Sequence, residues 1–143
     1  MRICGLRRTQ EVAIRDDDTL LRRVIFADPK YCYTPEGRPT SASFLLRKGE
    51  VGLSVDLERL TTHQRAVVDP RKYKLFGFKA SVVRVLGLCC WHAPLADNRA
   101  HSLIGPATNA PEKFRDFRTL QPALSITKTL ARALAEAAAP VDR

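Results

Sequence analysis

The densest group of reactive side chains in the sequence joins two cysteines to two histidines: Cys89, Cys90, His92 and His101. Thiolate and imidazole ligands together suit zinc. If this segment forms a β-hairpin, alternation along each strand places Cys90 and His92 on one face, where His101 can join them, and excludes Cys89. The chain has no C-x-x-C pair. We therefore expect no cofactor, and a zinc ion held by Cys90, His92 and His101 is the alternative.

His101 is also a candidate general acid or base, because imidazole titrates near neutral pH. In this hypothesis Asp56 or Asp97 orients the ring, and nearby arginines hold the phosphate group of a substrate. The competing interpretation is a strand histidine whose ring binds a backbone carbonyl or water. That interpretation is favoured, because catalysis requires a mutual geometry that a sequence does not supply.

Signatures of the common enzyme classes are absent from the sequence. It contains no Gly-rich phosphate loop, no nucleophile elbow, no paired-histidine zinc helix and no dinucleotide fingerprint. Ser41, Ser43 and Ser54 have no base beside them in sequence, so we interpret them as the outward faces of strands. The sequence therefore favours a binding protein over an enzyme.

A basic and aromatic segment, residues 71–79, indicates a different chemistry. Its cations suit phosphates and its rings suit stacked bases, as in proteins that bind single-stranded nucleic acid. The predicted binding residues, with two tyrosines from an earlier loop, are Arg71, Lys72, Tyr73, Lys74, Lys79, Tyr31 and Tyr33. The alternative is that Phe76 and Phe78 belong to the core and that the lysines are solvated strand ends.

The charge balance supports an anionic partner. The chain carries 24 Lys and Arg against 15 Asp and Glu, a net charge of +9, and 17 of the 24 are arginine. The planar guanidinium group suits phosphates and carboxylates better than an ammonium group does. An arginine-rich proteome would give the same bias without any such partner.

Length and composition predict one compact domain over residues 1–143. Hydrophobic residues make up 45% of the chain and charged residues 27%, as in globular proteins. No apolar run is long enough for a membrane helix or an export signal, so we expect a cytoplasmic protein with reduced cysteines and no membrane partner. Residues 1–15 are expected to form a basic arm, and residues 106–111 a linker into the C-terminal helices.

Local patterns predict short strands and helices. An apolar stripe after Asp18 predicts a helix over Thr19–Phe26, and two alternating segments, Ser41–Arg47 and Leu53–Leu57, predict a hairpin. Glu11–Ile14 is a possible edge strand. Residues Ser81–Leu86 fit a β-branched strand or a helix ended by Gly87, and the helix is favoured. The further predicted elements are a helix after Thr61 or Thr62, a strand over Leu75–Phe78, paired strands Leu88–His92 and Ala100–Ile104, and helices over Glu112–Leu120 and over Ile126–Ala138 capped by Ser125.

These elements predict an α+β fold: a single compact domain with a small, mainly antiparallel sheet, short helices, and a C-terminal helix packed on the sheet. The apolar stripe Ile126, Leu130, Leu134 and Ala137 would face the sheet.

Three stretches, Gly52–Asp56, Val83–Gly87 and Pro94–Gly105, resemble a loosely defined group of short bacterial proteins of unknown function. The resemblance covers about a third of the chain. It implies a bacterial, cytoplasmic source and a compact α+β domain. It supplies no activity and no catalytic residues, but it includes His101 and the loop that begins at Pro94.

The leading hypothesis is a small basic binding module or accessory subunit that engages an acidic macromolecule, either nucleic acid or a protein complex that handles it. One alternative is a hydrolase or transferase that acts on a phosphate-containing substrate through His101. A third is a protein-binding adaptor or antitoxin-like inhibitor, which an exposed apolar patch beside the terminal helix would favour.

Overall fold

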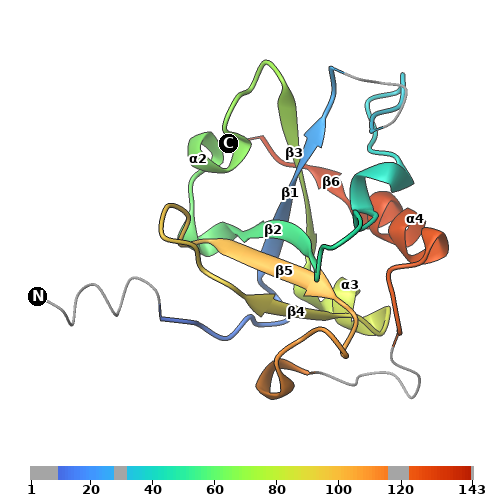
Figure 1. Cartoon of the computed structure of the whole chain (residues 1–143). Helices are drawn as coiled ribbons and strands as arrows, with labels where there is room; N and C mark the ends of the chain where they lie inside the picture. Colours follow the sequence, from blue (N-terminus) through green and yellow to red (C-terminus); the bar gives the residue numbers. More distant parts are fainter. Residues whose placement is uncertain (1–9, 28–31, 116–122, 143) are drawn as a thin grey trace, which may run out of the picture.

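The computed structural model describes residues 10–27, 32–115 and 123–142. Six antiparallel strands form one sheet in the order β4-β5-β2-β1-β3-β6 (Figure 1). The strands are β1 Thr19–Ile25, β2 Leu53–Leu57, β3 Tyr73–Lys79, β4 Cys89–His92, β5 His101–Gly105 and β6 Ala139–Pro140. The α-helices are α2 His63–Val67, α3 Ala80–Val85 and α4 Lys128–Ala137, and the 3-10 helices are η1 Ser41–Phe44, η2 Glu58–Leu60 and η3 Glu112–Phe114. The predicted α+β class is confirmed.

The predicted helix over Thr19–Phe26 is wrong, because this segment is the strand β1. β1 pairs with β2 on one side and with β3 on the other. A strand in this position has both faces to bury, so apolar residues need not follow a helical stripe. Leu20 and Val24 enter one core cluster, whereas Leu21 enters another on the opposite face.

The predicted hairpin of residues 41–57 is half right. Leu53–Leu57 is the strand β2, but it pairs with β1 and β5 rather than with residues 41–47. Ser41–Phe44 forms the 3-10 helix η1 instead. The hydroxyl of Ser43 donates to the Cys32 carbonyl at 2.8 Å, and this long-range contact fixes a segment whose alternation alone suggested a strand.

Several local predictions are confirmed. The Thr62 side chain caps α2 by accepting a hydrogen bond from the Arg65 amide, β3 contains the predicted strand, and β4 pairs with β5. α3 is followed by Gly87 with a φ of 85°, a conformation that glycine adopts at little cost.

The two ends of the chain differ from the prediction. Thr127, not Ser125, caps α4. The predicted helix over Glu112–Leu120 is only the 3-10 turn η3 as far as the structure describes it, and residues 116–120 lie outside the described residues. Glu11–Ile14 forms no strand, and residues 1–9 of the predicted arm lie outside the described residues.

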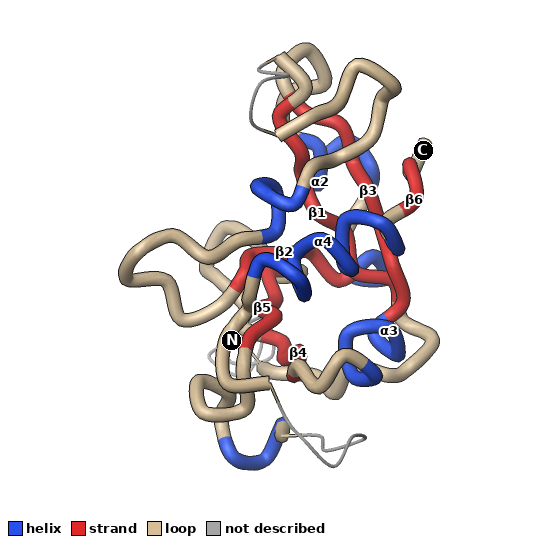
Figure 2. Tube along the Cα trace, turned by 90° about the vertical axis from the view of Figure 1, so that its right-hand side faces the viewer, coloured by secondary structure: helices blue, strands red, loops and turns tan. Residues whose placement is uncertain are grey.

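One face of the sheet is covered and apolar, and we call it the covered face. Its side chains pack with α3, α4 and η1 in the main core. The backbone of α4 lies in front of the strands in Figure 2. The buried residues of this core that belong to strands and to α4 include Leu20, Val24, Leu53, Val55, Leu57, Phe76, Phe78, Ala131 and Leu134. This packing confirms that the C-terminal helix lies on the sheet.

The opposite face, which we call the open face, is covered in part by α2 and, over β4 and β5, by residues 107–114. Ala66 and Val67 of α2 pack on Leu21 and Leu75 there. Residues that lie opposite each other in antiparallel strands share a face, and Asp56 pairs with both Leu21 and His101. The open face therefore also carries Asp56 and His101.

The sheet opens between β1 and β2. Only two residue pairs, Leu20 with Leu57 and Leu21 with Asp56, join these strands, whereas seven pairs join β1 to β3. In Figure 1, β2, β5 and β4 run across the molecule while β1 and β3 run up it. This divergence exposes backbone groups in the middle of the sheet and creates the space for a cleft.

No helix in the described ranges 10–27, 32–115 and 123–142 is long and apolar enough to cross a membrane.

Candidate functional site

A polar cleft occupies the place where β1 and β2 diverge, with a cavity volume of about 210 Å³. Three arginines, a serine, a histidine and two carboxylates contribute most of its polar lining. The lining residues are Leu21, Arg22, Arg23, Ile25, Arg47, Glu50, Ser54, Val55, Asp56, Tyr73 and His101. The surplus of cations over carboxylates makes it a candidate anion site.

Arg22 fills the gap between the diverging strands. Its Nη1 donates to the Ser54 carbonyl at 2.8 Å, and its Nε donates to the Ser43 carbonyl at 2.9 Å. β1 pairs with β2 only at Asp56 and Leu57, so the guanidinium takes the place of a missing ladder partner for the Ser54 carbonyl. Arg22 is thus held rigidly between β1, β2 and η1, with its charge at the cleft.

Burial lowers the pKa of Arg22 to about 10. That value already includes the charge of Glu50, which raises the pKa, and the smaller effects of Arg23 and Arg47, which lower it. Arg22 is still protonated at neutral pH, and its environment penalises that positive charge. An anion in the cleft would remove part of this penalty.

Arg23 and Arg47 bring two more charges to the cleft. Arg23 donates from Nη1 to the Ala66 carbonyl at 3.0 Å and lies 3.5 Å from an Asp56 carboxylate oxygen. Arg47 is exposed, and among the described residues no carboxylate lies within ion-pair distance of its guanidinium. Arg47 therefore keeps a charge free for a ligand.

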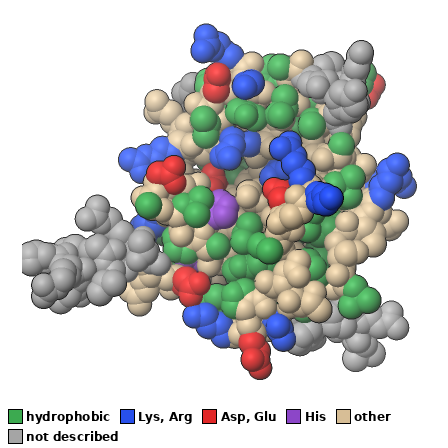
Figure 3. Space-filling view, viewed as in Figure 1, with side chains coloured by type: hydrophobic (Ala, Val, Ile, Leu, Met, Phe, Trp, Pro, Cys, Tyr) green, Lys and Arg blue, Asp and Glu red, His purple; other side chains and the backbone are tan. Residues whose placement is uncertain are grey.

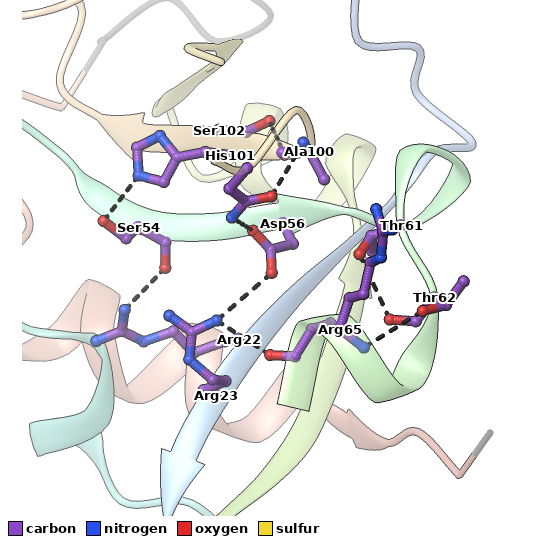
Figure 4. A network of polar contacts seen from close by, with 12 residues as sticks. Arg22, Arg23, Ser54, Asp56, Thr61, Thr62, Arg65, Ala100, His101 and Ser102 are labelled. Atoms are coloured by element: carbon purple, nitrogen blue, oxygen red, sulfur yellow. Dashed lines mark hydrogen bonds and ion pairs between the residues drawn. The ribbon is translucent and has the colours of Figure 1, made fainter. Parts of the chain in front are cut away.

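Ser54 and His101 meet on the open face (Figure 4). His101 Nε2 lies 3.2 Å from Ser54 Oγ, and His101 Nδ1 lies 2.8 Å from the Ala93 carbonyl oxygen. A carbonyl only accepts, so Nδ1 of the neutral ring carries the proton. Nε2 then accepts from the Ser54 hydroxyl, which is the arrangement of a nucleophile beside a base.

A second cavity of about 780 Å³ adjoins the cleft and shares Arg23, Ser54 and His101 with it. Its other lining residues are Leu60, Thr61, Gln64, Arg65, Val68, Leu95, Asp97, Asn98 and Arg99. Five arginines and three carboxylates line the two cavities together. On this side of the molecule, Figure 3 shows basic side chains gathered near a histidine.

The predicted orienting carboxylates do not contact the His101 ring. Asp56 lies opposite His101 in the sheet, but it accepts from Asn98 Nδ2 at 2.9 Å and pairs with Arg23. Asp97 is exposed and lines the larger cavity. The Ala93 carbonyl orients the ring instead.

The expectation that Cys90, His92 and His101 share a face is wrong. His92 pairs with Ser102, and Cys90 pairs with Ile104. This register places both on the covered face, whereas His101 is one residue out of phase and lies on the open face. Among the residues described, no three His, Cys, Asp or Glu side chains are grouped so that they could hold a metal ion.

His92 has a structural environment. It is fully buried, its Nδ1 accepts from the Val12 amide at 2.9 Å, and its Nε2 lies 2.6 Å from the Arg99 carbonyl oxygen. Both ring nitrogens are thus satisfied by backbone groups, and the ring connects the segment before β1 to the loop before β5.

The predicted basic and aromatic segment is divided between the two faces and the two ends of β3. Tyr73 lies at the cleft, whereas the neighbouring Lys74 lies over the rings of Phe26 and Tyr33, at 5.1 and 5.6 Å from their centroids. Lys79, at the far end of the strand, donates to the Asp17 carbonyl and the Thr19 hydroxyl.

Three of the predicted binding residues, Tyr33, Tyr73 and Lys74, line one cavity of about 360 Å³. Arg71 and Lys72 are exposed in the turn before β3, where Arg71 pairs with Asp69. Phe76 and Phe78 are buried in the core, as the alternative interpretation held. Tyr31 lies outside the described residues.

Sequence reasoning did not identify Arg22, Arg23, Arg47 or the pairing of Ser54 with a base. One signal was present: two adjacent arginines interrupt the apolar run of residues 20–25. Charges inside a buried strand are rare without partners or function. A helix over Thr19–Phe26 leaves both arginines outside its apolar stripe, so the helix prediction did not use that signal.

Comparisons of this chain with protein-family models, with curated proteins and with solved structures give no match. Function therefore has to be inferred from the chemistry of the site.

Proposed function

We propose that this chain binds a phosphate-bearing ligand, a nucleotide or a nucleic acid, in the cleft between β1 and β2. The observation that carries the proposal is the convergence of Arg22, Arg23 and Arg47 on one small cavity. Guanidinium groups form strong, directional hydrogen bonds with phosphate oxygens. The proposal keeps the acidic partner inferred from the net charge and moves its binding site to the cleft.

The electrostatics of Arg22 favour an anionic ligand over a neutral one. Burial penalises its charge most, Glu50 attracts that charge, and Arg23 and Arg47 repel it. A phosphate would relieve this repulsion while accepting hydrogen bonds from arginines that are already positioned. Arg22 is fixed by two backbone carbonyls, so ordering it costs no further side-chain entropy on binding.

The experiment is a calorimetric titration of the full chain with inorganic pyrophosphate and with a short single-stranded RNA, at low and moderate salt. Arg47→Gln removes a cleft charge that makes no ion pair among the described residues. We expect it to weaken binding about tenfold. We also expect RNA binding to depend less on salt. The loss of one phosphate contact lowers the slope of log binding constant against log salt concentration by about 1.

Arg71→Gln is the matched control, because it removes the same charge from an exposed position outside the cleft. It should leave pyrophosphate binding unchanged and have at most a small effect on RNA. If Arg71→Gln weakens binding and Arg47→Gln does not, the cleft is the wrong site and the basic segment 71–79 is the better one.

A further inference from the structure

We propose that Ser54 is a nucleophile activated by His101, and that the pair cleaves or transfers the phosphate ester bound by the three cleft arginines. This inference rests on the proposed function, because it assigns chemistry to the same ligand. The observation behind it is that the serine hydroxyl and the unprotonated ring nitrogen are 3.2 Å apart at the point where the two cavities meet.

The geometry positions the base without a carboxylate. The Ala93 carbonyl holds the proton on Nδ1 of His101, so Nε2 is free to take the Ser54 proton. In other nucleophile and base pairs a third group fixes the tautomer in the same way. A backbone carbonyl does so with less stabilisation of the imidazolium than a carboxylate would give, which suits a substrate with a good leaving group.

Each of the two cavities would hold a different part of the substrate. The smaller one, of about 210 Å³, has Arg22, Arg23 and Arg47 for a phosphate group. The larger one, of about 780 Å³, also has arginines, Arg23, Arg65 and Arg99, and offers Gln64, Asn98 and Asp97 as hydrogen-bonding groups for a polar leaving group. Ser54, His101 and Arg23 line both. The bond between phosphorus and leaving group would therefore lie beside the serine.

The reaction balances with water as the second substrate. His101 Nε2 takes the proton from Ser54 Oγ as Oγ attacks phosphorus, the bond from phosphorus to the leaving oxygen breaks, and that oxygen receives the proton from Nε2. Water then attacks phosphorus and gives a proton to Nε2, the bond from phosphorus to Oγ breaks, and Oγ is reprotonated. An alcohol in place of water gives transfer instead of hydrolysis.

The test uses a fluorophosphonate probe, in which attack by Oγ forms the phosphorus–oxygen bond and expels fluoride. We expect mass spectrometry of the labelled full chain to locate the adduct on Ser54. Ser54→Ala should abolish the adduct, and His101→Ala should slow its formation at least about tenfold, in line with the usual contribution of a general base.

Matched controls distinguish labelling of a serine that His101 activates from labelling of any accessible serine. Ser81→Ala and His63→Ala remove a partly exposed serine and a partly exposed histidine that lie outside both cavities, and both should leave labelling unchanged. Release of nitrophenol from bis(p-nitrophenyl) phosphate, lost in Ser54→Ala, is the second readout. Labelling of Ser54 at an equal rate in His101→Ala would overturn the inference.

The outcomes distinguish the two proposals. Pyrophosphate binding without labelling of Ser54 and without nitrophenol release overturns the nucleophile and leaves the binding function intact. Labelling of Ser54 that depends on His101 but is not slowed by pyrophosphate supports the nucleophile and overturns the cleft as a phosphate site.

Discussion

Two histidines on neighbouring strands have opposite environments. His92 on β4 faces the covered side, fully buried, with backbone groups at both ring nitrogens. His101 on β5 faces the open side, half-buried, with one nitrogen on a backbone carbonyl and the other on a serine hydroxyl. The difference shows that residue type alone does not give a role: sheet register decides which side chains each ring meets.

The same contrast applies to the two faces of the sheet. The covered face gains its stability from close packing of apolar side chains. The open face carries arginines, carboxylates and hydroxyl groups around a cleft, which makes it poorer in packing and richer in groups that can bind a ligand. Substitutions on each face test this division.

Phe44→Ala should give the largest loss of stability. Phe44 is fully buried on the covered face, and its ring lies 5.9 Å from that of Phe78. Removal of a buried phenyl group leaves a cavity and costs about 3–5 kcal/mol. Urea denaturation measures this cost as a fall in the free energy of unfolding. A loss below 1 kcal/mol would mean that the covered face is not the main core.

The histidine pair provides the most direct comparison. His92→Ala should lower the free energy of unfolding by about 2–4 kcal/mol, because it removes a buried ring and leaves the Val12 amide and the Arg99 carbonyl without that partner. His101→Ala should cost less than about 1 kcal/mol. Equal costs in the same denaturation experiment would remove the distinction between the two rings.

Val68→Gly should stabilise the protein by about 1 kcal/mol. Val68 follows α2 beside the larger cavity, with a φ of 65°, and it is the one non-glycine residue in the described ranges with positive φ. A β-branched side chain is strained there. The measurement is the melting temperature, which should rise, and an unchanged or lower value would show that this side chain contributes more by contact than it costs in strain.

The smallest effect concerns an ion pair at the start of β1. Burial alone would raise the pKa of Asp18. The hydrogen bond from the Arg15 amide, together with the hydrogen bond and the positive charge of Arg59, outweighs the effect of burial. The pKa therefore lies below its ordinary value of 3.8. A carboxylate with a lowered pKa stabilises the fold above its ordinary pKa, and this contribution is lost as pH falls through the folded-state pKa.

Asp18→Asn should therefore be less stable than the parent chain at neutral pH, and the gap should narrow as pH falls below 3.8. Denaturation series at several pH values measure this gap, with Asp69→Asn as a control at a more exposed pair. A gap that stays constant with pH would contradict the lowered pKa.

Much of the fold follows from local patterns in the sequence. Thr62 and Gly87 mark helix ends through the chemistry of capping, and the strands β4 and β5 follow from alternation on either side of a polar loop. The failure at β1 has a physical cause. Its apolar residues lie on both faces because neighbours on both sides bury them, and no local pattern reports how many neighbours a strand will have.

The α+β class and the basic character of the chain follow from the sequence alone, and so does a strand face that carries Ser54 and Asp56, although Asp56 is buried in the structure. Only the tertiary structure decided that His101 lies beside Ser54 and away from Cys90 and His92, and that three arginines meet in one cleft. His101 and Ser54 are 47 positions apart, and Arg47 meets Arg22 and Arg23 from a separate segment of the chain. Both arrangements depend on sheet register and on the divergence of β1 from β2. A one-residue change of register would reverse every face assignment.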